Sequence, residues 1–131
     1  MSIRIVQLGS ARAPDEGLRI GTVRRPPRGV PKDEFAKRNY YDVWLPLLSP
    51  SVPLMKKAQQ AQKGADAKAW AAFARGFRTQ MRQAEAARVL DLLAALSHQT
   101  NLSLGCYCPQ EARCHRSILR TLLVERKAVL T

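Results

Sequence analysis

The chain has 131 residues, of which 46% are hydrophobic, and this composition excludes an intrinsically disordered chain. Lys and Arg total 22 against 10 Asp and Glu, giving a net charge of +12, and 15 of the 22 basic residues are Arg. No run approaches the roughly 20 apolar residues that cross a membrane, and no secretion signal is apparent. We therefore expect one cytoplasmic domain over residues 1–131, with anionic partners and no membrane association.

The first half of the chain predicts three short strands separated by loops. Residues 2–8 alternate as a strand, residues 9–17 are a Gly- and Pro-containing loop, and residues 18–23 form a second strand. The following Arg- and Pro-rich run, residues 24–29, excludes regular structure. A short helix is expected over 31–35 and a strand over 40–45. Ser49 to Ser51 then offer caps for a helix that runs to about Gln62.

The second half predicts helix, helix, strand and helix in that order. Asp66 is a plausible N-cap for a helix over 67–83, whose aromatic stripe is Trp70, Phe73, Phe77 and Met81. A helix over 85–99 presents Val89, Leu92, Leu93 and Leu96. A strand follows over 101–107, and the last helix, over 114–127, is buried through Ile118, Leu119, Leu122 and Leu123.

This alternation of elements predicts an α/β fold. The helix, strand and helix at the end of the chain favour a parallel crossover unit. We expect a small, mostly parallel sheet with helices on both faces, which is a three-layer sandwich.

The segment from Gly105 to Ser117 carries the residues suited to chemistry. It links a strand end to a helix start, where open α/β sheets place their ligands and where helix amides favour an anion. Arg113 and Arg116 raise the local potential. Cys114, at the helix N-terminus, is expected to have a lowered pKa, and Cys108 and His115 are further candidate catalytic groups.

Several interpretations of this segment stay open. Three cysteines within nine residues, with no export signal, predict free or metal-bound thiols rather than disulfides. Zinc binding by Cys106, Cys108, Cys114 and His115 has an unusual spacing, and adjacent residues diverge on a helix, so we expect no metal and no cofactor. A thiol-nucleophile loop is a second alternative, although four residues rather than five separate Cys108 from Arg113, unlike the tyrosine phosphatase loop. We favour a non-covalent anion pocket over both, while small cysteines packed at a strand end need no function.

Two longer blocks resemble a known family. The run Val23-Arg-Arg-Pro-Pro-Arg-Gly-Val-Pro-Lys-Asp-Glu, the run Asp42-Val-Trp-Leu-Pro and the run Trp70-Ala-Ala-Phe are similar to the YeaO-like branch of the domain of unknown function 488 family. Cys106-Tyr-Cys-Pro and Cys114-His-Arg-Ser resemble the strand–loop–Cys-His-Arg signature of the other branch. The resemblance implies a compact α/β sandwich and no particular activity. Where that branch usually has Asp-Arg-Leu-Trp-Pro-Arg-Gly, this chain has Val-Arg-Arg-Pro-Pro-Arg-Gly at positions 23–29. The Asp and Trp are missing, which puts an Asp-dependent chemistry in doubt.

If the second and last strands are parallel, their end loops face one another. Arg24, Arg25 and Arg28 would then lie across one crevice from Cys114, His115 and Arg116, with Tyr40 lining it or packing on the sheet. We predict a small anionic ligand, phosphate-bearing or nucleotide-like, in that crevice, with possible Cys/His chemistry. The alternative is a nucleic-acid-binding module that uses the basic surface, including the stripe of Arg75, Arg78 and Arg82.

Overall fold

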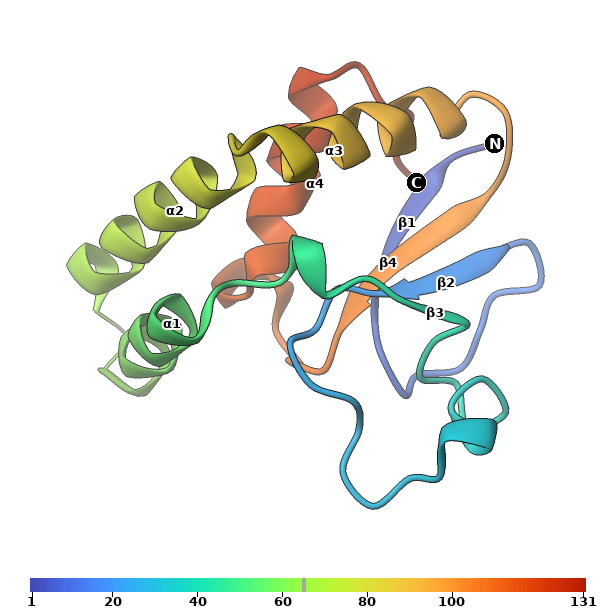
Figure 1. Ribbon diagram of the computed structural model, residues 1–131, viewed down its shortest axis with the longest axis horizontal. Helices are drawn as coiled ribbons and strands as arrows, with labels where there is room; N and C mark the ends of the chain where they lie inside the picture. The colour runs from blue at the N-terminus through green and yellow to red at the C-terminus, as the bar shows by residue number, and fades with distance from the viewer. Residues whose placement is uncertain (65) are drawn as a thin grey trace.

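The computed structural model describes residues 1–64 and 66–131, and its centre is a four-stranded parallel sheet with strand order β1-β4-β2-β3 (Figure 1). Every neighbouring pair of these strands is parallel. The strands are β1 (Ile3–Gln7), β2 (Leu18–Gly21), β3 (Val43–Trp44) and β4 (Leu102–Cys106). The predicted α/β fold with a mostly parallel sheet is confirmed.

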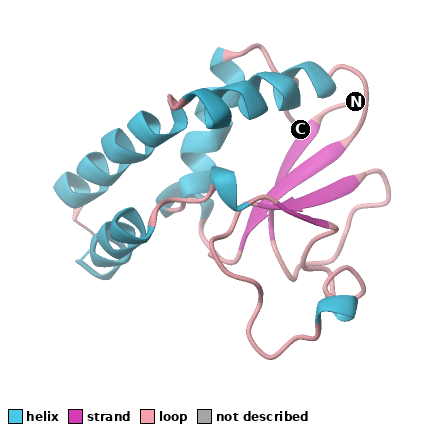
Figure 2. Cartoon of the chain, in the orientation of Figure 1, coloured by secondary structure: helices cyan, strands magenta, loops and turns pink. Residues whose placement is uncertain are grey.

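The helices follow the predicted order (Figure 1), and Figure 2 shows them in cyan beside the magenta strands. The α-helices are α1 (Val52–Gly64), α2 (Ala67–Met81), α3 (Ala84–Leu96) and α4 (His115–Glu125), and short 3₁₀ helices occupy η1 (Lys32–Glu34), η2 (Pro46–Leu48) and η3 (Glu111–Arg113). Asp66 caps α2 by accepting hydrogen bonds from the Lys68 and Ala69 amides, as predicted. Among the described residues, no helix is both long and apolar enough to span a bilayer.

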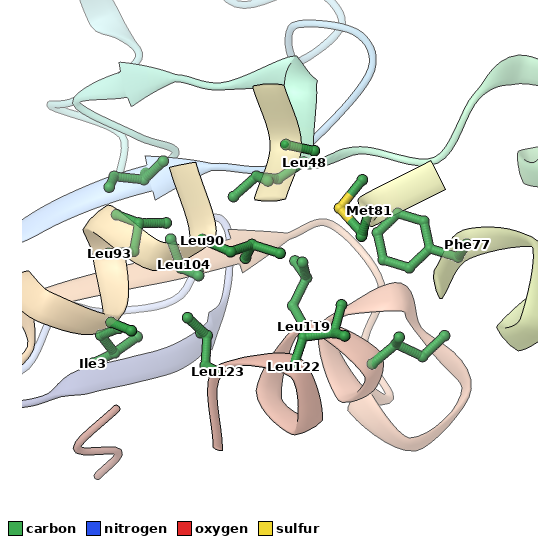
Figure 3. Packing of buried hydrophobic residues seen from close by; sticks show 14 of the residues in the cluster. Ile3, Leu48, Phe77, Met81, Leu90, Leu93, Leu104, Leu119, Leu122 and Leu123 are labelled. Atoms are coloured by element: carbon green, nitrogen blue, oxygen red, sulfur yellow. The ribbon is translucent and has the colours of Figure 1, made fainter. Parts of the chain in front are cut away.

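One face of the sheet is covered by helices. Figure 3 shows leucines of α3 and α4 meeting Ile3 and Leu104 of the sheet. Phe73, Phe77 and Met81 of α2 are buried in the same core, so the aromatic stripe is a packing surface, as predicted. Burying a side chain of this size contributes about 1.5–3 kcal/mol.

The other face is covered by loops and η1, which makes the sheet the middle of three layers. Tyr41 lies against Gly21, where an added Cβ would be 2.4 Å from its ring, and the Phe35 ring meets Tyr41 edge-on at 5.3 Å. Arg19 points into this layer and is fully buried. Its guanidinium makes a bidentate ion pair with Glu16 at 2.6 and 2.8 Å, and Ser103 donates to the same carboxylate.

Two sequence predictions were wrong in detail. The strand expected over 40–45 is only Val43–Trp44, because the chain turns at Asn39, whose φ is 66°, and Tyr41 then covers the second face. In α3, Leu93 is buried and Val89 and Leu96 pack against the core as predicted, whereas Leu92 is 57% exposed and Leu90 is buried in its place. Leu90 and Leu92 both lie within four residues of this face, so spacing alone did not separate them.

Candidate functional site

A cavity of about 700 Å³ opens where the parallel strands end. The loop after β2, the end of β4, the start of α4 and one side of α1 surround it, and Figure 1 shows these segments gathered at that end of the sheet. Its apolar wall includes Val23, Met55, Ala58 and Phe73. Its polar and cysteine lining comprises Arg24, Arg25, Arg28, Tyr40, Ser49, Gln59, Gln62, Cys106, Tyr107, Cys108, Arg113, Cys114 and His115.

Three free thiols meet on one side of this cavity. The Sγ atoms of Cys106 and Cys108 are 3.9 Å apart, and Cys114 Sγ lies 3.6 Å from Nδ1 of His115. Cys106 and Cys114 are buried, whereas Cys108 is only partly buried and receives a contact from Gln62 Nε2 at 3.9 Å. The ligand atoms of Cys106, Cys114 and His115 lie within 4.8 Å of one another, so this group is able to hold a metal ion.

The imidazole of His115 has a fixed orientation. Its Nε2 lies 2.7 Å from the backbone oxygen of Thr22 and 3.1 Å from the Thr22 hydroxyl. A carbonyl oxygen only accepts, so Nε2 carries the hydrogen and Nδ1 presents its lone pair to Cys114. Burial lowers the pKa of His115 to about 4, and the ring is therefore neutral at pH 7.

The three thiols shift one another's pKa in different directions. A hydrogen bond from Cys106, followed by one from Cys114, holds the pKa of Cys108 far below its usual range. The hydrogen bond to Cys108 raises the pKa of Cys106. For Cys114, a hydrogen bond from Cys106 acts downward, but the Cys108 thiolate and burial outweigh it and the pKa is raised. The lowered pKa thus belongs to Cys108 and not to Cys114, where the sequence had placed it.

Arg116 lies below the cavity and does not line it. Its guanidinium is 3% exposed and donates to the oxygens of Val6 at 2.7 Å and Cys108 at 2.6 Å, and to Cys114 Sγ at 3.4 Å. These contacts hold the loop after β4 against the start of α4. Arg116 therefore positions the thiols, and its donors are not available to a ligand as the sequence had suggested.

The other predicted arginines do meet at the cavity, but they differ in whether their guanidiniums already have contacts within the protein. Arg24 donates to the backbone oxygens of Ser49 and Pro50, and the Arg113 guanidinium lies 5.7 Å from the centre of the Trp70 ring. Arg25 and Arg28 are exposed, and within residues 1–64 and 66–131 neither guanidinium has a protein partner. These two side chains are the cations best placed to meet a ligand.

Tyr40 lines the cavity beside Tyr107, with ring centres 6.3 Å apart. Tyr107 also donates through its hydroxyl to the backbone oxygen of Arg25 at 2.8 Å, which ties the two strand-end loops together. Burial raises the pKa of Tyr107 above its usual range, so the phenol remains a donor.

Sequence reasoning missed Thr22, Gln62 and Tyr107. Thr22 orients His115 from the end of β2, and Gln62 reaches the thiol cluster from α1 while donating to the Arg113 oxygen at 2.7 Å. Gln62 lay at the predicted end of a helix, and no local pattern placed that helix over the cavity. Thr22 had a weak signal, because it is a hydroxyl residue at a strand end.

Residues 3–127, almost the whole chain, match the family model DUF488-N3a, which is described as the active DUF488-N3 subclade. The chain belongs to the DUF488 family. The predicted family is thereby confirmed, and the YeaO-like branch stays a prediction. All the cavity residues of this DUF488 protein lie inside the matched range. Neither the curated proteins nor the solved structures gave a match to the chain.

Proposed function

We propose that this DUF488 protein binds a small anionic, phosphate-bearing ligand in the cavity and acts on it with a thiol. The observation that carries the proposal is the meeting, in one cavity, of a thiol cluster and two exposed guanidiniums that have no partner among the described residues. The description of the matched subclade as active is in keeping with a chemical role.

The cavity divides the two tasks between its rim and its wall. Arg25 and Arg28 at the exposed rim supply charge-assisted hydrogen bonds to an anion without first breaking an internal contact. The apolar wall accommodates a carbon-rich portion of the ligand. Tyr40 and Tyr107 offer ring edges and faces between these two zones.

Cys108 is the thiol assigned to the chemistry because it is the most accessible of the three. Its sulfur forms a bond to the electrophilic atom of the bound anion while the bond to the leaving group breaks, and the leaving group departs with the electron pair. One water molecule then hydrolyses the adduct and restores the thiol. His115 keeps Cys114 and the start of α4 in place during these steps.

Paired alkylating reagents test both parts of the proposal. Iodoacetate is anionic and iodoacetamide is neutral, and both form an S–C bond as iodide leaves. We expect the ratio of the iodoacetate rate to the iodoacetamide rate to be higher at Cys108 than at an ordinary exposed thiol. Arg25→Gln with Arg28→Gln should reduce that preference about fivefold, because the rim cations no longer concentrate the anion. Mass spectrometry identifies the labelled cysteine.

A charge-matched control makes the result specific. Arg75→Gln with Arg88→Gln removes the same charge from exposed positions outside the cavity. It should leave the preference for iodoacetate unchanged. Calorimetry should likewise show that inorganic pyrophosphate binds this control as it binds the wild type, and binds the variant with Arg25→Gln and Arg28→Gln more weakly. Equal losses in both double variants, or labelling of Cys108 with no preference, would contradict the proposal.

Nucleic-acid binding is the second candidate, favoured by the net charge of +12. In the proposed stripe, Arg75 and Arg82 are exposed, while Arg78 is already paired with Glu125 at 2.7 Å. Binding through such a surface weakens steeply with salt because it releases counterions. Fluorescence anisotropy with a labelled oligonucleotide should therefore show affinity at low salt that Arg75→Gln with Arg82→Gln reduces. Absence of binding at low salt removes this candidate.

A further inference from the structure

We infer that Cys106, Cys108, Cys114 and His115 form a binding site for a thiophilic divalent metal ion, for which Zn²⁺ is the chemical fit. This inference goes beyond the proposed function, because it describes a metal-loaded state in which Cys108 is a ligand, whereas the proposed thiol chemistry uses Cys108 in the metal-free protein. It also reverses the expectation from the sequence that no metal is bound.

The first argument is the spacing of the ligand atoms. Tetrahedral Zn²⁺ with Zn–S of about 2.3 Å and Zn–N of about 2.0–2.1 Å places two sulfurs about 3.7–3.8 Å apart and a sulfur and a nitrogen about 3.5–3.6 Å apart. The Cys106–Cys108 sulfurs are separated by 3.9 Å, and Cys114 Sγ and His115 Nδ1 by 3.6 Å. These two pairs thus stand at almost the separations that one tetrahedral ion imposes. The ligand atoms of Cys106, Cys114 and His115 all lie within 4.8 Å of one another, and Cys108, outside that group but beside Cys106, is the ligand that must shift to complete the set.

The second argument is the orientation of His115. A metal-binding histidine presents one ring nitrogen to the ion and donates the hydrogen on the other to a carbonyl or carboxylate. Thr22 supplies that acceptor through its backbone oxygen, and its own hydroxyl donates to the Gly105 oxygen at 2.9 Å. The unprotonated Nδ1 therefore points toward the thiols, with its partner already in place.

The third argument removes the objection from the sequence. Adjacent residues diverge when both are helical, but Cys114 is the N-cap of α4 and has extended backbone angles of φ −120° and ψ 151°. Its side chain turns back toward His115, the first helical residue. The predicted divergence of these two side chains was wrong because the helix begins between them.

The fourth argument is charge. Three thiolates and a divalent ion carry a net charge of −1. Arg116 is buried directly beneath them, with its Nε 3.4 Å from Cys114 Sγ, and within the described part of the chain it pairs with no carboxylate. Its single positive charge balances the loaded site. The partly exposed Cys108 faces the cavity, which gives an ion a path to the buried ligands.

Cobalt titration of the reduced, metal-stripped protein tests the inference. Tetrahedral Co²⁺ bound by thiolates gives visible d–d bands and a sulfur-to-metal charge-transfer band. We expect saturation at one ion per chain and displacement by Zn²⁺. Zn²⁺ should also protect Cys106 and Cys114 against iodoacetamide. Cys108→Ser should weaken binding about tenfold or more by removing one ligand.

Matched variants keep the test decisive. His115→Asn should weaken Co²⁺ binding and change its spectrum, whereas His98→Asn, at the other histidine, should change neither. Circular dichroism identifies any variant that fails to fold, and Cys108→Ser, at the partly exposed position, provides the test in that event. A folded, reduced wild type without a charge-transfer band, or equal Co²⁺ affinity in Cys108→Ser, would overturn the inference. Because the reagent preference is measured on metal-free protein, its result stands apart from this one.

Discussion

Two buried arginines, Arg19 in β2 and Arg116 in α4, differ in what neutralises their charge. Arg19 faces the Glu16 carboxylate and the oxygens of Ser10 and Asn39. Arg116 contacts two backbone oxygens and a thiol. It also lies in the first turn of α4, where the helix itself contributes partial positive charge.

This difference separates a charge neutralised by a carboxylate from one that lies against backbone oxygens and a thiol. The pair of Arg19 and Glu16 is internally neutral and stabilises the loop layer over the second face. Within the described residues Arg116 forms no ion pair with a carboxylate, and its Nε lies 3.4 Å from Cys114 Sγ. Burying a cation is costly unless an anion accompanies it, so the site itself favours thiolates or an anionic metal–thiolate group.

Removal of the Glu16 carboxylate should have the largest effect on stability. Glu16→Gln leaves Arg19 buried without its counter-ion, and we expect a loss of about 3–5 kcal/mol in the free energy of unfolding. Urea denaturation measures this loss. Asp15→Asn is the neighbouring control, because that carboxylate is 74% exposed and pairs with Arg4 only at 3.5 Å. A similar loss in both variants would mean that the buried pair is not what stabilises this layer.

Replacement of Arg116 should have the next largest effect and should also reach the thiols. Arg116→Met leaves the oxygens of Val6 and Cys108 without donors, and we expect a loss of at least about 2 kcal/mol in unfolding free energy, at the lower end of about 1–3 kcal/mol for each unsatisfied group. Co²⁺ affinity should fall as well, since the compensating charge is lost. Arg116→Lys should restore part of the metal affinity but little of the stability, because an ammonium does not span both oxygens. If Arg116→Lys restored stability but not Co²⁺ affinity, Arg116 would have a purely structural role.

Acid should reduce the stability that the pair of Arg19 and Glu16 contributes. Burial acts to raise the pKa of Glu16, but hydrogen bonds from Arg19 and Ser103 outweigh it and the folded pKa is lowered. The resulting stabilisation is present above the unfolded pKa of about 4.3 and is lost as the pH falls through the folded value. Urea midpoints measured from neutral to acidic pH should decline less steeply for Glu16→Gln than for the wild type. Parallel declines would contradict this assignment.

The smallest effect is expected at the surface. Arg78 and Glu125 form an ion pair whose side chains are 32% and 48% exposed. Arg78→Gln should therefore cost less than about 1 kcal/mol in unfolding free energy, and added salt should reduce even that difference. A loss comparable to that of Glu16→Gln would show that burial is not what distinguishes the pairs.

The architecture was predictable because the hydrophobic periodicity and the turn residues agreed over most of the chain. Helices α2 and α4 had clear apolar stripes, and β4 followed from a short apolar run between two helices. The strand over residues 40–45 was overpredicted because its aromatic residues resemble a strand, although Tyr41 serves to cover Gly21. Composition alone does not distinguish a side chain within a sheet from one that lies on it.

The site was predictable in place but not in its internal roles. Parallel strands bring the loop with Arg24 to the same edge as Cys114, and this followed from topology. The different surroundings of Arg28 and Arg116 did not follow from topology. Whether a guanidinium is exposed or buried depends on which distant segments pack against it. The orientation of His115 likewise depends on Thr22, which is 93 residues away in the chain.

The Tyr107 hydroxyl holds the backbone of Arg25 and leaves its side chain untouched. A hydrogen bond to the main chain thus holds the loop of Arg25 near the sulfur atoms. The charge at the cavity entrance comes instead from the exposed side chains of Arg25 and Arg28, which do not take part in that hydrogen bond. Substitutions at positions 25 and 28 would therefore change the charge at the rim while this main-chain contact is kept. Under the function proposed above, such a division would let selectivity diverge while the thiol cluster stays in place.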